Sequence, residues 1–261
     1  MPDGKQSEKM RRDWDERARK DAYFYIATWE KDWDPQRFFD SGEADVRTFV
    51  DPALRRQGFL PQGKTMLEIG SGVGRMTRSF ARRFVRVIAL DVSPEMLSRG
   101  RALHKEHDNI LWLLGDGIGL SMIAENQIDF VFSYIVLHHI PSPDLALGYI
   151  REMLRVLKPG GVFLFQFNSL FGPSMNWKGR LIWGVIDCLR EPLFGMSFDK
   201  LGRWLSSSFH LDELAAGRTW RGAPLEVRRV LDAVQAAGGD VVDMTGPGTP
   251  ATWCLGQKQL A

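Results

Sequence analysis

Cysteine is scarce in this chain, and a long apolar run is missing altogether. Cys188 and Cys254 are the only cysteines among 261 residues, which is too few for a disulfide framework, so a reducing, cytoplasmic location is expected. The most membrane-like stretch, residues 181–189, is short and contains Asp187, whereas a spanning helix needs about 20 apolar residues. Residues 1–20 are charged and lack the apolar core of a signal peptide. We therefore expect no stable membrane insertion.

An excess of charge of either sign is also missing. Lys and Arg together number 34 and Asp and Glu 32, which gives a formal net charge of +2. Nucleic-acid-binding proteins usually carry a much stronger basic surface, so no nucleic-acid partner is expected. We find no internal repeat, no low-complexity linker and no convincing group of residues with metal-ligand spacing, so no metal is expected. The length suits one large domain or a core with a modest insertion.

Large aromatic and charged residues are concentrated in the segment from about 10 to 60, which is predicted to be helical with Pro35 and Gly42 as interruptions. From Lys64 the pattern changes to short apolar runs that alternate with helical stretches, as in a largely parallel sheet. Ser93-Pro94 and Ser142-Pro143 each supply a helix N-cap followed by proline at the first helical position. The predicted strands are residues 64–69, 85–90, 110–114, 129–134, 161–167, 240–244 and 251–257.

The segment from about 168 to 223 interrupts this alternation. It is irregular and aromatic, with expected helices near 179–191 and 199–216, and a further helix is expected at 224–237. The sequence therefore predicts a helical segment over residues 1–60 and an α/β domain over 61–261 that carries an insertion at about 169–223.

The strongest motif lies between the first predicted strand and a helix, in the order Glu68-Ile-Gly70-Ser71-Gly72-Val-Gly74-Arg75. Glycine lets the backbone turn sharply and approach a ligand closely, and the following helix offers free N–H groups. Asp91 follows Gly70 by 21 residues at the end of the second strand, where an acid can accept hydrogen bonds from ribose hydroxyls. The dinucleotide motif G-x-G-x-x-G would require glycine at position 75, which is arginine.

The chain resembles the class I S-adenosylmethionine-dependent methyltransferases. The segments that carry the resemblance are EIGSGVG, ALDVS, LLGDG, DFVFSYIVLHHI and LRVLKPGG, in this order between Glu68 and Gly161. The resemblance covers residues 64–168 well and 224–257 loosely. It implies a Rossmann-like sheet of seven mostly parallel strands, with helices on both faces and an antiparallel last strand.

The resemblance also implies roles for individual residues. Glu68 and the loop of Gly70, Ser71, Gly72 and Gly74 would face the methionine end of S-adenosylmethionine, and Asp91 would hold the ribose hydroxyls. Val92 and Met96 would lie near adenine, Asp116 would accept a hydrogen bond from its amino group, and Gly117 would flank Asp116. Ser133 and Tyr134 would lie beside the sulfonium and the incoming substrate.

Several of these residues also have purely structural interpretations. Asp91 could be a loop acid or a helix cap, and Gly-Asp-Gly at 115–117 is a good turn sequence. His138 and His139 are candidate general bases, although a structural role is favoured, and His210 is a further candidate. Arg75, Arg78, Arg82 and Arg86 recur at helical spacing and are interpreted as a solvated face.

The favoured hypothesis is an enzyme that methylates a small molecule and releases S-adenosylhomocysteine. The helical segment and the insertion would form the acceptor pocket, with at least two aromatic residues lining it; Trp29 and Trp177 are candidates. A methyltransferase that acts on a macromolecule and a non-catalytic S-adenosylmethionine sensor remain alternatives. The sequence does not identify the acceptor or the attacking O, N, S or C atom. A helix near 181–189 could pair with a copy of itself to form a homodimer.

Overall fold

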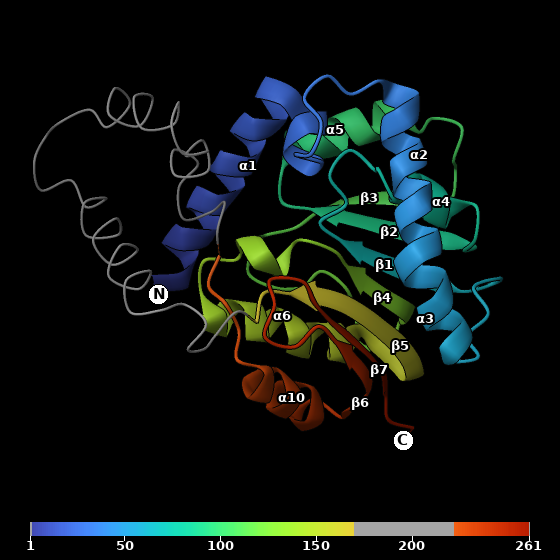
Figure 1. Ribbon diagram of the computed structural model, residues 1–261, viewed down its shortest axis with the longest axis vertical. Coiled ribbons are helices and arrows are strands. Elements are labelled where there is room, and N and C mark those ends of the chain that lie inside the picture. The colour runs from blue at the N-terminus through green and yellow to red at the C-terminus, as the bar shows by residue number, and fades with distance from the viewer. Residues whose placement is uncertain (1, 170–221, 261) are drawn as a thin grey trace, which may run out of the picture.

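The computed structural model describes residues 2–169 and 222–260, and a seven-stranded sheet forms its centre (Figure 1). The strand order is β3-β2-β1-β4-β5-β7-β6, and β7 alone runs antiparallel to its neighbours. The predicted α/β sheet with an antiparallel last strand is therefore confirmed. The strands are β1 (Thr65–Ile69), β2 (Arg86–Asp91), β3 (Ile110–Leu114), β4 (Ile128–Ser133), β5 (Leu157–Phe167), β6 (Gly239–Thr245) and β7 (Thr252–Lys258).

Helices connect these strands and fill most of the N-terminal segment. The two predicted caps are confirmed: the Ser93 hydroxyl accepts a hydrogen bond from Met96 N at 3.1 Å, and the Ser142 hydroxyl accepts one from Leu145 N at 3.3 Å. No helix in the described part of the chain is long and apolar enough to cross a membrane. The helices are α1 (Pro2–Ile26), α2 (Pro35–Asp45), the π-helix η1 (Val46–Val50), α3 (Asp51–Arg56), α4 (Thr77–Ala81), α5 (Pro94–Leu103), the 3-10 helix η2 (Leu137–His139), α6 (Pro143–Val156) and α10 (Val227–Ala236).

Side-chain alternation along the central strands divides the core into two layers. In β1, Leu67 and Ile69 pack in the layer that contains α6 and α10, whereas Met66 packs with η1, α3 and α4 on the opposite face. Because β2 and β4 lie on either side of β1, the chain leaves β1 in one direction and returns to pair β4 from the other. Ligands of open α/β sheets bind at such a switch point, outside the carboxyl ends of the strands.

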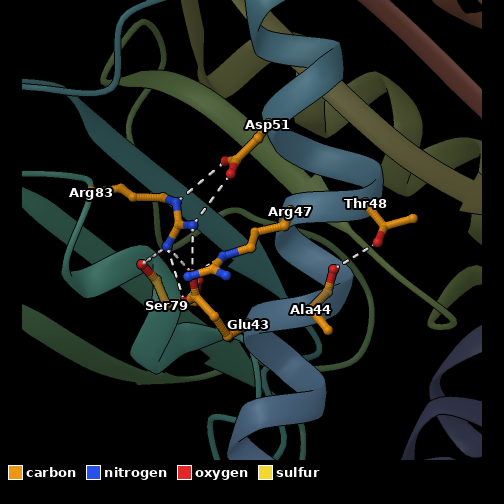
Figure 2. A network of polar contacts seen from close by, with 7 residues as sticks. All are labelled: Glu43, Ala44, Arg47, Thr48, Asp51, Ser79 and Arg83. Carbon is orange, nitrogen blue, oxygen red and sulfur yellow. Dashed lines mark hydrogen bonds and ion pairs between the residues drawn. The ribbon is translucent and has the colours of Figure 1, made fainter.

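The helix pair α2 and α3 is fixed to the sheet domain through Arg83, which follows α4. Figure 2 shows the Arg83 guanidinium between two carboxylates, with Nη2 2.9 Å from Glu43 Oε1 and Nε 3.3 Å from Asp51 Oδ1. The Ser79 hydroxyl donates to Glu43 at 2.6 Å. The hydrogen bonds from Arg83 lower the pKa of Glu43 to about 2. This group of charges joins α2, η1 and α3 to the loop after α4.

The predicted interruption at Gly42 is wrong. Pro35 does separate α1 from α2, with Asp34 as the N-cap, but Gly42 lies inside α2. A Cβ on Gly42 would lie 2.0 Å from the backbone oxygen of Arg75. The glycine therefore permits close packing of α2 against the loop after β1 rather than ending the helix. The expected helices near 179–191 and 199–216, and with them nearly all of the predicted insertion, lie outside the described residues.

Candidate functional site

A cavity of about 340 Å³ lies at the carboxyl ends of β1, β2 and β4, at the switch point of the sheet. Its walls come from the loops that follow these strands, and from α1 and the loop after it. Gly70, Gly72 and Asp91 of the predicted cofactor site contribute to the wall, together with Val92 and Met96. These predicted residues, which are far apart in the sequence, are therefore brought together.

The glycine loop adopts backbone conformations that side chains resist. Gly70, Gly72 and Gly74 have φ angles of 76°, 56° and 90°, in the left-handed region that glycine adopts at no steric cost. The backbone N–H groups of Gly70 and Ser71 donate to the Leu90 carbonyl at 2.7 and 3.0 Å, which ties the loop to the end of β2. Space is also limited, because a Cβ on Gly70 would lie 2.1 Å from the Val136 side chain. The motif is thus required by the geometry of the loop.

Asp91 links the glycine loop to the turn after β2. Its Oδ2 accepts a hydrogen bond from Gly72 N at 2.8 Å, and its Oδ1 accepts one from Ser93 N at 2.9 Å. Burial raises the pKa of this carboxyl, and the backbone hydrogen bonds act in the opposite direction. Asp91 therefore holds the loop in shape and also forms part of the cavity wall.

Glu68 and Arg75, at the two ends of the motif, are not among the residues that line the cavity. Glu68 accepts a hydrogen bond from the Thr77 hydroxyl at 2.5 Å, and burial raises its pKa to about 8. Arg75 is only 4% exposed; its guanidinium pairs with Asp45 at 2.7 Å and lies 5.4 Å from the centre of the Trp29 ring. Both residues support the loop from outside the cavity.

The predicted solvated arginine face is only partly correct. Arg82 and Arg86 are exposed, and Arg78 is half-buried with its guanidinium 5.4 Å from the centre of the Phe39 ring. The prediction is wrong for Arg75, because α2 packs over this end of the arginine series and buries the side chain. Helical spacing indicates a shared face but does not reveal whether another helix covers it.

Asp116 and Gly117 form the turn after β3 and do not line the cavity. Asp116 Oδ1 accepts hydrogen bonds from the backbone N–H groups of Ile118 and Gly119, at 2.7 and 3.0 Å. Gly117 has a φ of 76°, and a Cβ there would lie 2.5 Å from the Ser7 hydroxyl oxygen of α1. Gly-Asp-Gly therefore forms a turn that Asp116 Oδ1 stabilises, and its other carboxylate oxygen is not used in these two hydrogen bonds.

Two serines of the predicted site have buried hydroxyl groups with no hydrogen-bond partner. Ser71, between the two cavity-lining glycines, is 4% exposed, and Ser133, at the end of β4, is fully buried. Neither serine lines the cavity. Buried hydroxyls are nearly always paired in proteins, with water, a ligand or another protein group. These two hydroxyls are therefore buried polar groups that keep an unused hydrogen-bonding capacity next to the cavity-lining residues Gly70, Gly72 and Tyr134.

The adjacent histidines His138 and His139 place their side chains in different surroundings. His138 Nε2 lies within hydrogen-bond distance of the Pro250 carbonyl, outside the cavity wall, and burial lowers its pKa. His139 lines the cavity, and its ring packs edge-on against Trp14 with 4.9 Å between ring centroids. Tyr134 also lines the cavity and stacks on Trp253 of β7 at 5.3 Å. Of these candidates, His139 and Tyr134 can face a substrate in the cavity.

Aromatic residues from the N-terminal segment line the cavity, as predicted. Trp14, Tyr25 and Trp29 all contribute to its wall, whereas Trp177 lies outside the described residues. Sequence reasoning missed Ile135 and Tyr149. Ile135 has a φ of 56° in the turn after β4, and Tyr149 reaches the cavity from α6. A tyrosine on the apolar face of a predicted helix offered the only sequence signal for Tyr149.

Comparisons with known proteins agree with this architecture. Residues 67–165 match the family described as a methyltransferase domain. An uncharacterized methyltransferase from Mycobacterium leprae is 35% identical over 141 residues, which cover 53% of this chain and 50% of that protein. The biotin biosynthesis bifunctional protein of Cellvibrio japonicus is 35% identical over 123 residues, which cover 47% of this chain and 22% of that protein. The chain spans about half the length of the mycobacterial relatives that it matches.

Solved structures share the fold. Magnesium protoporphyrin IX methyltransferase from Synechocystis, solved with bound S-adenosylhomocysteine, aligns with a TM-score of 0.63 at 15% identity over 97% of this chain and all of that one. Phosphoethanolamine N-methyltransferase 1 from Haemonchus contortus, in complex with phosphoethanolamine and S-adenosylhomocysteine, aligns with a TM-score of 0.54 at 19% identity. That alignment covers 67% of this chain and 35% of that one. At these identities the likeness concerns the fold alone.

Proposed function

We propose that this chain, whose residues 67–165 match a methyltransferase domain, is a class I S-adenosylmethionine-dependent methyltransferase that transfers a methyl group from S-adenosylmethionine to a small molecule. One observation carries the proposal: the glycine loop and the Asp91 carboxylate form one continuous part of the cavity wall at the switch point of the sheet. Relatives that match about half of the chain are named as methyltransferases, which supports the methyl-transfer part of the proposal.

The residues around the cavity fit this cofactor. Gly70 and Gly72 leave room for the methionine end, and the unpaired Ser71 hydroxyl offers a hydrogen bond beside them. Asp91 would bind the ribose hydroxyls, because a carboxylate accepts two of them at once. Val92 and Met96 provide apolar surface for adenine.

Five further residues lie behind the cavity wall, so the roles predicted for them require small movements of the protein. Glu68 and Gly74 would support the loop against the methionine end. Asp116 would present its second carboxylate oxygen to the adenine amino group, with Gly117 beside it. The Ser133 hydroxyl, which has no partner, would lie near the sulfonium.

S-adenosylmethionine supplies an activated methyl group when bound, so the protein needs mainly to position the acceptor and to exclude water. We assign the acceptor to the part of the cavity bounded by Tyr134, His139 and Trp29. Stacking on Trp253 fixes the Tyr134 ring, and burial raises the pKa of its phenol, which keeps it a hydrogen-bond donor. His139, oriented by its contact with Trp14, would accept a proton from an acceptor that needs a base. His138 has a structural role, in contact with the Pro250 carbonyl.

The shape of the cavity supports a small acceptor. α1 and the loop after it cover one side, so that Met10, Trp14, Tyr25 and Trp29 enclose the space together with the strand-end loops. A macromolecular acceptor would need an open face with strong charge, whereas the formal net charge is only +2. Cys254 is a buried free thiol, which fits a reducing compartment, and we place the activity in the cytoplasm.

Calorimetric titration of the purified protein with S-adenosylhomocysteine tests the proposal, with NADH as the control. We expect micromolar binding of S-adenosylhomocysteine and no binding of NADH. Binding of NADH alone would overturn the cofactor assignment. A screen of acceptors for release of S-adenosylhomocysteine then separates an enzyme from a sensor that binds without turnover.

A further inference from the structure

The turn after α5 gathers three potential metal ligands away from the cavity. Among the described residues, His104, Glu106 and His107 form the one group of His, Cys and acidic side chains that places a ligand atom from each member within 4.8 Å of the others. His107 N donates to the His104 carbonyl at 3.0 Å, which closes the turn and brings the two imidazoles to the same side of it. The sequence spacing His-x-Glu-His, folded into this turn, therefore brings the three side chains together.

His104 has the arrangement of a metal-binding imidazole. It is 2% exposed, and its Nε2 lies 3.1 Å from the Val73 carbonyl. Because a carbonyl oxygen only accepts hydrogen bonds, Nε2 carries the hydrogen, and Nδ1 of the neutral ring keeps a free lone pair. Nδ1 is buried and has no hydrogen-bond partner. Imidazoles that bind metals typically donate their other N–H group to a carbonyl or carboxylate in this way.

The other two ligands are spaced for a tetrahedral ion. His107 Nε2 lies 3.7 Å from Glu106 Oε1, close to the roughly 3.4 Å between two ligands of an ion with tetrahedral bonds of about 2.1 Å. The Glu106 side chain is 54% exposed and that of His107 is 17% exposed, so that an ion can reach them from solvent. A hydrogen bond between these two groups would require a shorter distance than 3.7 Å.

We propose that His104, Glu106 and His107 bind one divalent transition-metal ion of the zinc class. Two imidazoles and one carboxylate suit Zn²⁺ and Co²⁺ better than Mg²⁺ or Ca²⁺, which prefer oxygen ligands. Three protein ligands leave the fourth position of the ion to a water molecule.

The ion would act on the glycine loop through His104. The Val73 carbonyl that accepts the hydrogen bond belongs to this loop, and a Cβ on Gly74 would lie 2.5 Å from His104 Nε2. Fixing the ring therefore fixes the loop that lies directly against it. This consequence rests on the proposed function, whereas metal binding itself does not.

The direct test is calorimetric titration of tag-free protein, stripped with EDTA, with ZnCl₂ in the absence of any other ligand. We expect one equivalent to bind, and His107→Ala to weaken the binding at least tenfold. Glu106→Gln should also weaken it, whereas Asp108→Asn, which changes an exposed carboxylate next to the turn, should leave it unchanged. Absorption of bound Co²⁺ in the visible range should show tetrahedral coordination in the wild type and be lost in His107→Ala.

Three outcomes would overturn the metal site: no binding of Zn²⁺, binding that His107→Ala leaves unchanged, or binding that His139→Ala removes instead. A second titration, with S-adenosylhomocysteine in the presence and absence of Zn²⁺, tests the link to the loop. We expect tighter binding with the ion present, and only in protein that keeps His107. If S-adenosylhomocysteine does not bind at all while Zn²⁺ does, the proposed function fails and the metal site stands.

Discussion

Two buried carboxylates near the end of the sheet differ in what their oxygen atoms bind. Both oxygens of Asp91 accept backbone hydrogen bonds, from Gly72 and Ser93, and the side chain also forms part of the cavity wall. Glu68 has one hydroxyl partner, Thr77, and lies behind the wall. One buried carboxylate therefore faces the cavity, whereas the other contacts only protein groups behind its wall.

Replacing Asp91 should weaken cofactor binding. In Asp91→Ala we expect the dissociation constant for S-adenosylhomocysteine to rise roughly ten- to hundredfold, because a charge-assisted hydrogen bond contributes about 1.5–3 kcal/mol. The variant also loses the two bonds to the loop backbone, so some loss of stability should accompany the change. Titration calorimetry measures the affinity, with Asp240→Ala, at an exposed position of β6, as the control. Unchanged affinity in Asp91→Ala would contradict the assignment of the ribose site.

Glu68 should make stability fall as the pH rises. Burial raises its pKa to about 8 in the folded protein, whereas a glutamate in an unfolded chain titrates near 4.3. Between these values the folded state holds a proton that the unfolded chain releases, so a higher pH favours unfolding by up to about 1.4 kcal/mol per pH unit. The contribution is complete below about pH 4.3 and is lost as the pH rises towards 8.

Glu68→Gln should remove this dependence. We expect the free energy of unfolding of the wild type, relative to that of Glu68→Gln, to decrease from pH 5 to pH 7.5. Urea unfolding at both pH values measures it. The control is Glu125→Gln, at an exposed position, which should follow the wild type. Parallel pH profiles for the wild type and Glu68→Gln would show that Glu68 is ionised in the folded protein.

At the scale of elements, α2, η1 and α3 follow one another without a break, and Arg83 joins two of their carboxylates (Figure 2). The side chains of Arg83, Glu43 and Asp51 are between 20% and 24% exposed. Removing the cation leaves two partly buried carboxylates without their main partner, which is costly. We expect Arg83→Met to reduce the free energy of unfolding by roughly 1–3 kcal/mol, as measured by urea unfolding.

Arg47 provides the matched control for this experiment. It lies on η1 and donates to the same Glu43 at 3.0 Å, but its side chain is 71% exposed. Exposed ion pairs contribute little, so Arg47→Met should change stability by less than about 0.5 kcal/mol. Equal effects of the two substitutions would mean that the position of Arg83 between the carboxylates has no special importance.

The sequence predicted the strands well because their apolar runs are short and bounded by turn residues. Each predicted strand overlaps an observed one, from residues 64–69 for β1 to 251–257 for β7. It also predicted the caps at Ser93 and Ser142, since their hydrogen bonds form within one turn of helix. Features that depend on packing between distant elements were not predictable. The prediction for Gly42 failed because the backbone that packs against it, at Arg75, is 33 residues away in the sequence.

The candidate site follows the same rule: its local sequence motifs were predictable, whereas its contacts between distant elements were not. The glycine loop and Asp91 follow from a local pattern at the ends of β1 and β2, and both line the cavity. The burial of Arg75 depends on α2, and the role of Tyr149 depends on the position of α6, neither of which local sequence reveals. The separation of His138 from His139 depends on the β6–β7 turn, which supplies the Pro250 carbonyl.

At the scale of the molecule, α1 connects three separate parts of the site. Near its start, the Ser7 hydroxyl donates to the Asp116 carbonyl at 3.0 Å; in its middle, Asp15 accepts hydrogen bonds from Ser93 and Glu95, each at 2.9 Å. At the end of α1, Ile26 lies close to the glycine loop: a Cβ built on Gly72 would lie 2.6 Å from Ile26 Cδ1. Figure 1 shows α1 beside α5, at the opposite end of the sheet from α10. α1, which is kinked at Asp21, therefore covers the loops after β1, β2 and β3 together.

Because the two parts of α1, on either side of the kink at Asp21, together contact all three loops, a ligand held by these loops should stabilise both parts. We expect S-adenosylhomocysteine to slow amide hydrogen exchange across residues 7–26, including residues that do not line the cavity, since opening of the helix would then require release of the ligand. Mass spectrometry of peptic fragments measures the exchange, and α10, which packs on α6 and β6, is the internal control. Slower exchange confined to the glycine loop would mean that α1 opens and closes independently of the bound ligand. Slower exchange in α1 that persists in Ser7→Ala but is lost in Asp15→Ala would place the coupling at the loop after β2, where the Asp15 carboxylate holds the start of α5.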